Sequence, residues 1–142
     1  MELVQRLLRD KLFLLALFIA PVFWWLNYYF ELSAAVVRVS WTFLFVVAVL
    51  YPVLEELCFR GALQGYLLQS AWGQKHLLRL SRANCLTSVV FVIFHLYGQS
   101  IFWSLAVFAP SLLFGYMRER HHSVFPCIIL HVFYNIGFFS LR

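Results

Sequence analysis

Three ionisable side chains lie close together in an otherwise apolar part of this chain. The segment 51–61 reads YPVLEELCFRG and places Glu55, Glu56 and Arg60 within six residues. A charged side chain costs about 3 kcal/mol or more at the centre of a bilayer, so those that occur there usually have a function. Further polar side chains occur in the apolar segments that follow: His95, His131 and Asn135.

Together these side chains have the parts needed to add water to a carbonyl group. A carboxylate such as Glu55 would hold and deprotonate the water, with His95 assisting. His131 and Asn135 are four residues apart, so they share one face of a helix. Both can donate hydrogen bonds to an oxygen that gains negative charge. The predicted catalytic residues are therefore Glu55, His95, His131 and Asn135.

Two more pairs have the spacing of helical neighbours and would support such a site. Glu56 and Arg60 are four residues apart and can form an ion pair, and the ring of Phe91 can back the imidazole of His95. Taken singly, each pair has a purely structural interpretation, such as a buried ion pair or a hydrogen bond between helices. Their joint occurrence in a chain with so few polar residues favours a functional site.

The composition places these residues in a membrane protein. Of the 142 residues, 63% are hydrophobic and only 12% are charged, whereas soluble domains are about one quarter charged. Mean hydropathy is +0.83. A transmembrane helix needs about 20 residues, so the length allows about five. We expect an all-α, polytopic helical bundle that forms a single membrane-embedded domain over 1–142, with its catalytic core at about 50–136.

Five apolar segments follow one another along the chain. Their predicted bounds are 12–30, 39–68, 85–97, 101–117 and 124–141. The third is short, and Pro52 and Pro110 should bend or break the second and fourth.

The positive charges indicate how these segments cross the membrane. Eight of the eleven Lys and Arg residues lie in the N-terminal stretch and in the loops 69–84 and 118–122, whereas Arg38 and Arg142 fall on the opposite side. By the positive-inside rule the N-terminus is cytoplasmic. The net charge of +5 therefore reflects membrane orientation, and we expect no nucleic-acid partner.

The order of these motifs resembles a known family. Glu55-Glu56-x-x-x-Arg60, Phe91-x-x-x-His95 and His131-x-x-x-Asn135 are similar to the three-motif signature of the CPBP family, the CAAX protease and bacteriocin-processing group also called Abi. The resemblance covers roughly residues 50–136. It implies an α-helical intramembrane endopeptidase that cleaves peptide bonds near the bilayer surface. Eukaryotic relatives remove the last three residues of prenylated CAAX proteins.

The resemblance also implies roles for individual residues. Glu55 would activate the water as in a glutamate protease, His95 would assist, and His131 and Asn135 would form the oxyanion site. Glu56, Arg60 and Phe91 would support the site. In a zinc-dependent version, Glu55, His95 and His131 would be the metal ligands. We favour the metal-free mechanism without a cofactor, because the chain has no H-E-x-x-H motif and Asn135 is a poor zinc ligand.

The expected partners are membrane lipid and a lipidated or C-terminally anchored peptide or protein substrate. Compact bacterial relatives resemble partners of C-terminal sorting signals, which favours a bacterial inner membrane. A non-enzymatic bacteriocin-immunity or abortive-infection protein is the main alternative, although a binding protein would not need the complete set of polar residues. A small transporter is a third alternative. It would need polar residues along a continuous path, whereas these cluster at one depth.

Overall fold

The described part of the chain is helical. The structure, a computed structural model, covers residues 2–29 and 40–140. These residues form helices apart from one short β-hairpin and the connecting turns, so the prediction of an all-α fold is confirmed. Glu31 and Arg38 of the first predicted loop lie outside the described residues, as does Arg142.

The described residues fall into two compact units. Unit 1 consists of Met1–Leu54 and Ile128–Arg142, and unit 2 consists of Glu55–Cys127. Two helices, α4 (Tyr51–Glu56) and α9 (Phe125–Ser140), contribute residues to both units. The single protease domain that the sequence predicts remains a prediction.

Unit 1 begins with two helices separated at Asp10. Helix α1 (Glu2–Arg9) ends directly before this residue, and α2 (Lys11–Tyr29) begins directly after it. The carboxylate of Asp10 accepts a hydrogen bond from the backbone N–H of Leu12 at 2.9 Å. An aspartate in this position stabilises the first turn of a helix, because the early N–H groups have no helical partner. The charged start of the chain is therefore a separate short helix.

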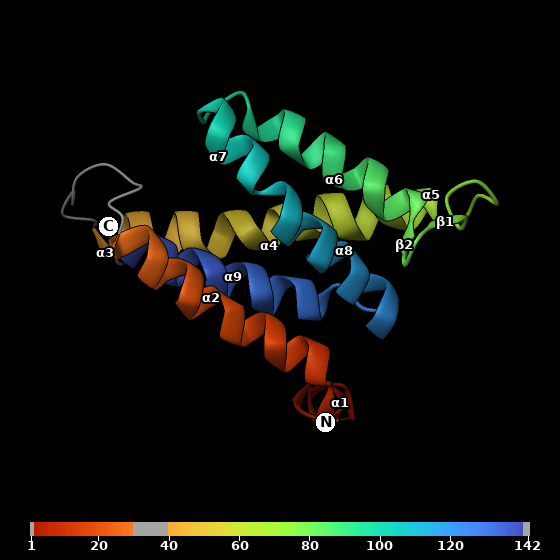
Figure 1. Cartoon of the computed structure of the whole chain (residues 1–142), viewed down its shortest axis with the longest axis horizontal. Helices are drawn as coiled ribbons and strands as arrows, with labels where there is room; N and C mark the ends of the chain where they lie inside the picture. Colours follow the sequence, from red (N-terminus) through yellow and green to blue (C-terminus); the bar gives the residue numbers. More distant parts are fainter. Residues whose placement is uncertain (1, 30–39, 141–142) are drawn as a thin grey trace. The chain divides into compact units, whose positions relative to one another are not determined.

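In unit 1, α2 and α9 lie side by side (Figure 1) and are joined by hydrogen bonds. The indole Nε1 of Trp24 donates to the carbonyl of Tyr134 at 3.1 Å, and the hydroxyl of Tyr134 donates to the carbonyl of Ala16 at 2.7 Å. Gly137 allows this close approach, because a Cβ atom there would collide with the Trp24 ring. These contacts fix α9 against α2.

The second predicted segment is a single long helical run with two widened stretches. Helix α3 (Trp41–Phe45) begins at Ser40, whose hydroxyl accepts from the N–H of Phe43. A π-helical stretch, η1 (Val46–Leu50), precedes α4, and a second, η2 (Leu57–Gln64), follows it and leads into α5 (Gly65–Leu67). Pro52 therefore does not break the run. The chain adapts to the missing N–H of proline by widening the turn before it.

Unit 2 continues with a hairpin and three helices. Strands β1 (His76–Leu77) and β2 (Leu80–Ser81) pair antiparallel. The helices that follow are α6 (Arg82–His95), α7 (Ile101–Ala106) and α8 (Phe108–His121).

Two of the predicted segments in unit 2 have different bounds in the structure. Helix α6 starts three residues earlier than predicted, because the Ser81 hydroxyl accepts from the N–H of Asn84 and caps it. The helix is interrupted at Val107, between α7 and α8, in the turn that precedes Pro110. The carbonyl four residues before Pro110 belongs to Ala106, the last residue of α7, so the missing N–H of proline falls at this interruption.

Two helical stretches are long and apolar enough to cross a membrane. They are Trp41–Leu67, with 27 residues, and Ile101–His121, with 21. Three shorter apolar helices have between 10 and 17 residues: Lys11–Leu26, Arg82–His95 and Phe125–Ser140. Helices α6 and α9 fall short of the length of about 20 residues that a straight crossing requires, whereas α2 as a whole has 19 residues.

Candidate active site

Glu55 and Glu56 occupy a short α-helical stretch between two π-helical ones. Helix α4 ends at Glu56, and η2 begins at the next residue. The side chain of Glu55 is half-buried, whereas that of Glu56 is fully buried. Local π-helical turns are rare and occur frequently at functional sites, because they change the direction in which side chains leave the helix. The two neighbouring carboxylates therefore lie in different surroundings.

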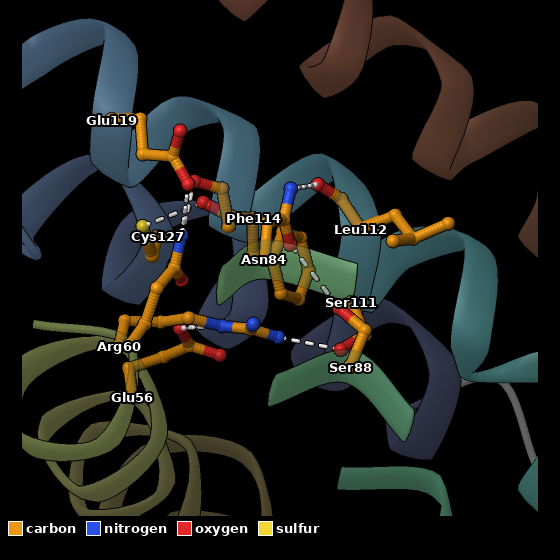
Figure 2. A network of polar contacts seen from close by, with 11 residues as sticks. Glu56, Arg60, Asn84, Ser88, Ser111, Leu112, Phe114, Glu119 and Cys127 are labelled. Atoms are coloured by element: carbon orange, nitrogen blue, oxygen red, sulfur yellow. Dashed lines mark hydrogen bonds and ion pairs between the residues drawn. The ribbon is translucent and has the colours of Figure 1, made fainter. Parts of the chain in front are cut away.

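Glu56 forms the ion pair that its spacing from Arg60 predicts. Its Oε2 lies 3.3 Å from Nε of Arg60, and neither side chain is exposed. Nη2 of Arg60 donates to the hydroxyl of Ser111 on α8 at 2.5 Å, which Figure 2 shows. The guanidinium also lies over the ring of Phe91 on α6, 5.6 Å from its centroid. Arg60 thus links η2 to both α6 and α8.

His95 lies at the last residue of α6 and contacts Phe91, as the spacing predicts. The two ring centroids are 4.3 Å apart. Nδ1 of His95 lies 2.9 Å from the backbone oxygen of Phe91. Because a carbonyl oxygen only accepts hydrogen bonds, this contact requires a proton on Nδ1. In the neutral ring Nε2 is then an acceptor, which is the state needed to receive a proton from water.

A second set of polar contacts joins the same three helices nearer to the end of α8. Glu119 accepts hydrogen bonds from Nε2 of Gln64 at 2.7 Å and from the Ser81 hydroxyl at 2.5 Å. Nε2 of Gln64 also donates to the carbonyl of Gly115 at 3.0 Å. We call Gln64, Ser81 and Glu119 the polar junction. It fixes η2, the start of α6 and the end of α8 relative to one another.

Asn84 adds a further contact between α6 and α8. Its Nδ2 donates to the carbonyl of Leu112 at 2.9 Å, and its Oδ1 accepts from the Ser88 hydroxyl at 3.2 Å (Figure 2). Gly115 faces this amide so closely that a Cβ atom there would collide with it. Helix α6, which carries His95, therefore packs closely against α8, which carries Ser111.

Sequence reasoning missed these supporting residues. One signal for α6 was present in the sequence, since Asn84 and Ser88 recur at the helical spacing that leads to Phe91 and His95. The structure shows that both are buried. Glu119 had no comparable signal. It lies among basic residues for which the sequence predicts a loop, whereas the structure continues α8 through them to His121.

His131 and Asn135 are located in unit 1, one turn apart on α9. His131 is buried, and Nδ2 of Asn135 donates to the backbone carbonyl of Val47 at 3.2 Å. An amide nitrogen carries two N–H donors, so this bond uses one of them. The contact fixes the orientation of Asn135 on its helix.

The seven residues singled out in the sequence are distributed over both units. Unit 2 holds five of them, Glu55, Glu56, Arg60, Phe91 and His95, and unit 1 holds the other two, His131 and Asn135. The ion pair and the contact between Phe91 and His95 are present. The catalytic roles remain predictions.

The zinc alternative also draws on both units. Its ligands would be Glu55 and His95 from unit 2 and His131 from unit 1. Within each unit, the described residues contain no group of three His, Cys, Asp or Glu side chains placed to hold a metal ion. The metal-free mechanism and the zinc-dependent one therefore both remain predictions.

Comparison with known proteins supplies a family for this arrangement. The model of a family described as type II CAAX prenyl endopeptidase Rce1-like matches residues 37–137. This range covers well over half of the chain and contains all seven residues singled out above. It agrees with the family that the three motifs predict. No curated protein and no solved structure matches the chain.

Proposed function

This chain belongs to the type II CAAX prenyl endopeptidase Rce1-like family, and on that premise we propose that it is an intramembrane glutamate-type endopeptidase. Members of this family are integral membrane proteases that act on membrane-anchored, prenylated proteins. The proposed substrate is a lipidated or C-terminally anchored peptide or protein, cut near the membrane. The observation that carries the proposal is the family match over 37–137, which includes the complete polar set from Glu55 to Asn135.

In the proposed mechanism Glu55 is the general base. Its carboxylate takes a proton from water as the water oxygen attacks the carbonyl carbon of the scissile peptide bond. His95, with its proton on Nδ1 and Nε2 as acceptor, helps to orient that water. When the carbon–nitrogen bond breaks, the proton passes to the leaving amine. The half-buried position of Glu55 beside the fully buried pair of Glu56 and Arg60 supports this assignment.

His131 and Asn135 stabilise the oxygen that becomes negative. Each supplies a hydrogen-bond donor to the tetrahedral intermediate, which lowers the barrier only if the donors are held in place beforehand. The bond from Asn135 to Val47 supports such preorganisation, because it leaves the second N–H of the amide for the substrate.

The proposed membrane arrangement has all five apolar segments in the bilayer. The N-terminus faces the cytoplasm of a bacterial cell, and the two units act as one protease domain. The substrate is a C-terminal sorting signal next to its membrane anchor, or a prenylated protein. Catalysis needs no metal, and zinc bound by Glu55, His95 and His131 is the alternative.

A cleavage assay tests the proposal. The purified protein in liposomes is mixed with a pool of lipidated and C-terminally anchored peptides, with and without a strong chelator. We compare wild type with Glu55→Gln, and use Glu2→Gln on the exposed face of α1 as a control for loss of one carboxylate. We expect Glu55→Gln to lower cleavage by about a hundredfold or more, and Glu2→Gln and the chelator to have no effect.

Other outcomes would overturn specific parts of the proposal. Loss of cleavage with chelator and its recovery with zinc would replace the metal-free mechanism by the zinc-dependent one. Full activity of Glu55→Gln would remove Glu55 from the mechanism. If a well-folded wild type cut none of the peptides but bound one of them equally with or without Glu55, the protein would be a binding protein of the immunity type.

A further inference from the structure

An apolar tip projects from unit 2 between α5 and α6. The hairpin of β1 and β2 lies beyond the end of α5 (Figure 1). Leu77 pairs with Leu80 across it, so Leu78 and Arg79 form the turn. The side chain of Leu78 is 95% exposed and that of Leu77 is 66% exposed. Two large apolar side chains therefore lie at the tip: Leu78 with almost no cover from the described part of the chain, and Leu77 mostly exposed.

The backbone at this tip is unfavourable for leucine. Leu78 has a φ of 58°, in the left-handed region that side chains with a Cβ atom rarely adopt. Tight hairpin turns favour glycine, asparagine or aspartate at such positions. A turn that only had to connect two strands would be more stable with glycine here. The leucine side chain is almost fully exposed, so burial does not offset the cost of this backbone conformation.

The base of the hairpin holds the tip in a fixed position. The backbone N–H of Arg82 donates to the carbonyl of Lys75 at 2.8 Å, and that of Ala83 donates to the carbonyl of Gly73 at 3.1 Å. The guanidinium of Arg82 lies over the Trp72 ring, 5.8 Å from its centroid. These contacts hold the base of the hairpin in place next to the start of α6.

Basic residues flank the tip in the sequence, and the carboxylate of Glu119 contacts the hairpin at its base, where it accepts a hydrogen bond from Ser81. Lys75, His76 and Arg79 flank the two leucines, and the sequence has no Asp or Glu between Glu56 and Glu119. Exposed leucines flanked by cations are typical of a segment that lies in the interface of an anionic membrane. In that interface, apolar groups enter the headgroup boundary and cations attract lipid phosphates.

We propose that this hairpin is a lipid-binding anchor. Leu77 and Leu78 enter the headgroup layer of the adjacent leaflet, and Lys75 and Arg79 bind the phosphates of anionic lipids. The predicted cytoplasmic location of this loop agrees with the proposal, since the cytoplasmic leaflet carries anionic lipids. The anchor is independent of whether the site in this chain hydrolyses peptides.

Fluorescence of a labelled hairpin tests the proposal. An environment-sensitive fluorophore is attached to Cys at position 76 (His76→Cys) in the full chain, with Cys58 and Cys85 changed to alanine and the buried Cys127 retained. The protein is placed in lipid discs of phosphatidylcholine, alone or with about a third of phosphatidylglycerol. We expect quenching by spin-labelled lipid to rise roughly twofold with the anionic lipid, and high salt to remove this increase.

Two changes in the labelled protein separate insertion from folding. Leu78→Gly relieves the strained φ, so the protein should unfold at the same or a higher temperature, while lipid quenching falls by about half or more. The double change Lys75→Gln and Arg79→Gln should remove only the dependence on anionic lipid. A label at Gln99, in the connection that follows α6, is the control and should not respond to lipid charge.

Three results would overturn the anchor. The first is a label at position 76 that reports bulk water in both kinds of disc. The second is quenching that is equal with and without phosphatidylglycerol. The third is fluorescence that reports burial of the label when soluble poly-glutamate is added but does not change with anionic lipid. This result would assign the tip to an acidic protein partner.

Discussion

Asn135 donates a hydrogen bond from Nδ2 to the backbone oxygen of Val47, 3.2 Å away. In the π-helical stretch η1, each carbonyl accepts from the N–H five residues later, as Val46 does from Tyr51. The donor for Val47 would be residue 52, which is proline and has no N–H. Because Pro52 donates no hydrogen bond to the Val47 carbonyl, that carbonyl can accept from Asn135 and orient its amide. Pro52 lies three residues before the predicted catalytic Glu55.

Replacing this proline should impair catalysis without damaging the fold. Pro52→Ala restores an N–H that competes with Asn135 for the Val47 carbonyl. Losing one donor to an oxyanion costs about a hundredfold or more in kcat, and a misplaced donor should cost less, about tenfold, with KM nearly unchanged. Steady-state kinetics on the peptide found in the cleavage screen measure this.

Pro110→Ala is the matched control for that variant. A new N–H at residue 110 would face the carbonyl of Ala106, four residues earlier, so it does not compete with Asn135 for the carbonyl of Val47. Its kcat should equal that of wild type. Unchanged kcat in Pro52→Ala, or an equal loss in both variants, would show that the bond between Asn135 and Val47 does not serve the reaction.

The protein should lose far more stability when one partner of the ion pair between Glu56 and Arg60 is replaced than when both are replaced. Arg60→Met leaves the carboxylate of Glu56 buried without its main counter-charge, which typically costs about 3–5 kcal/mol. The double variant Glu56→Leu and Arg60→Met removes both charges and should recover most of that loss. Thermal unfolding in detergent, followed by circular dichroism, measures both. A double variant that is no more stable than Arg60→Met would mean that the two side chains are not coupled.

The polar junction depends on the acceptor at Glu119. In Glu119→Ala the buried Ser81 hydroxyl and one bond of Gln64 lose their acceptor, so stability should fall by about 2 kcal/mol. Glu119→Gln keeps an oxygen that can accept both bonds and should lose less than half as much. Unfolding by denaturant in detergent distinguishes the two. Equal destabilisation would show that the negative charge, and not the hydrogen bonds, makes the contribution.

The contact between Gly115 and Asn84 leaves no room for a side chain. Gly115→Ala places a methyl group against the Asn84 amide, and such overpacking costs about 1–3 kcal/mol. Gly98→Ala is the control, because nothing lies within 4 Å of a Cβ atom there, and its stability should stay within about 0.5 kcal/mol of wild type. Thermal unfolding of both variants checks this, and equal values would contradict the close packing of α6 on α8.

Much of the local structure could be predicted because it depends on residues that are close in sequence. The apolar composition determined a helical membrane protein, since backbone groups in lipid must be satisfied within helices. Spacing by four residues placed Glu56 beside Arg60 and Phe91 beside His95, because the geometry of one helix decides which of its side chains are neighbours. The hairpin was missed, since its strands are only two residues long and lie in a polar connection.

Only the tertiary structure decided which distant residues complete these pairs. Ser111 binds Arg60 across 51 residues of sequence, and Glu119 binds Gln64 across 55. The partner of Asn135 is a backbone carbonyl 88 residues away. Such partners depend on the rotation and depth at which two helices pack, and these follow from the whole set of side chains at the contact. No short motif contains that information, so the residues predicted to do chemistry could be found in the sequence, whereas their distant partners Ser111, Glu119 and Val47 could not.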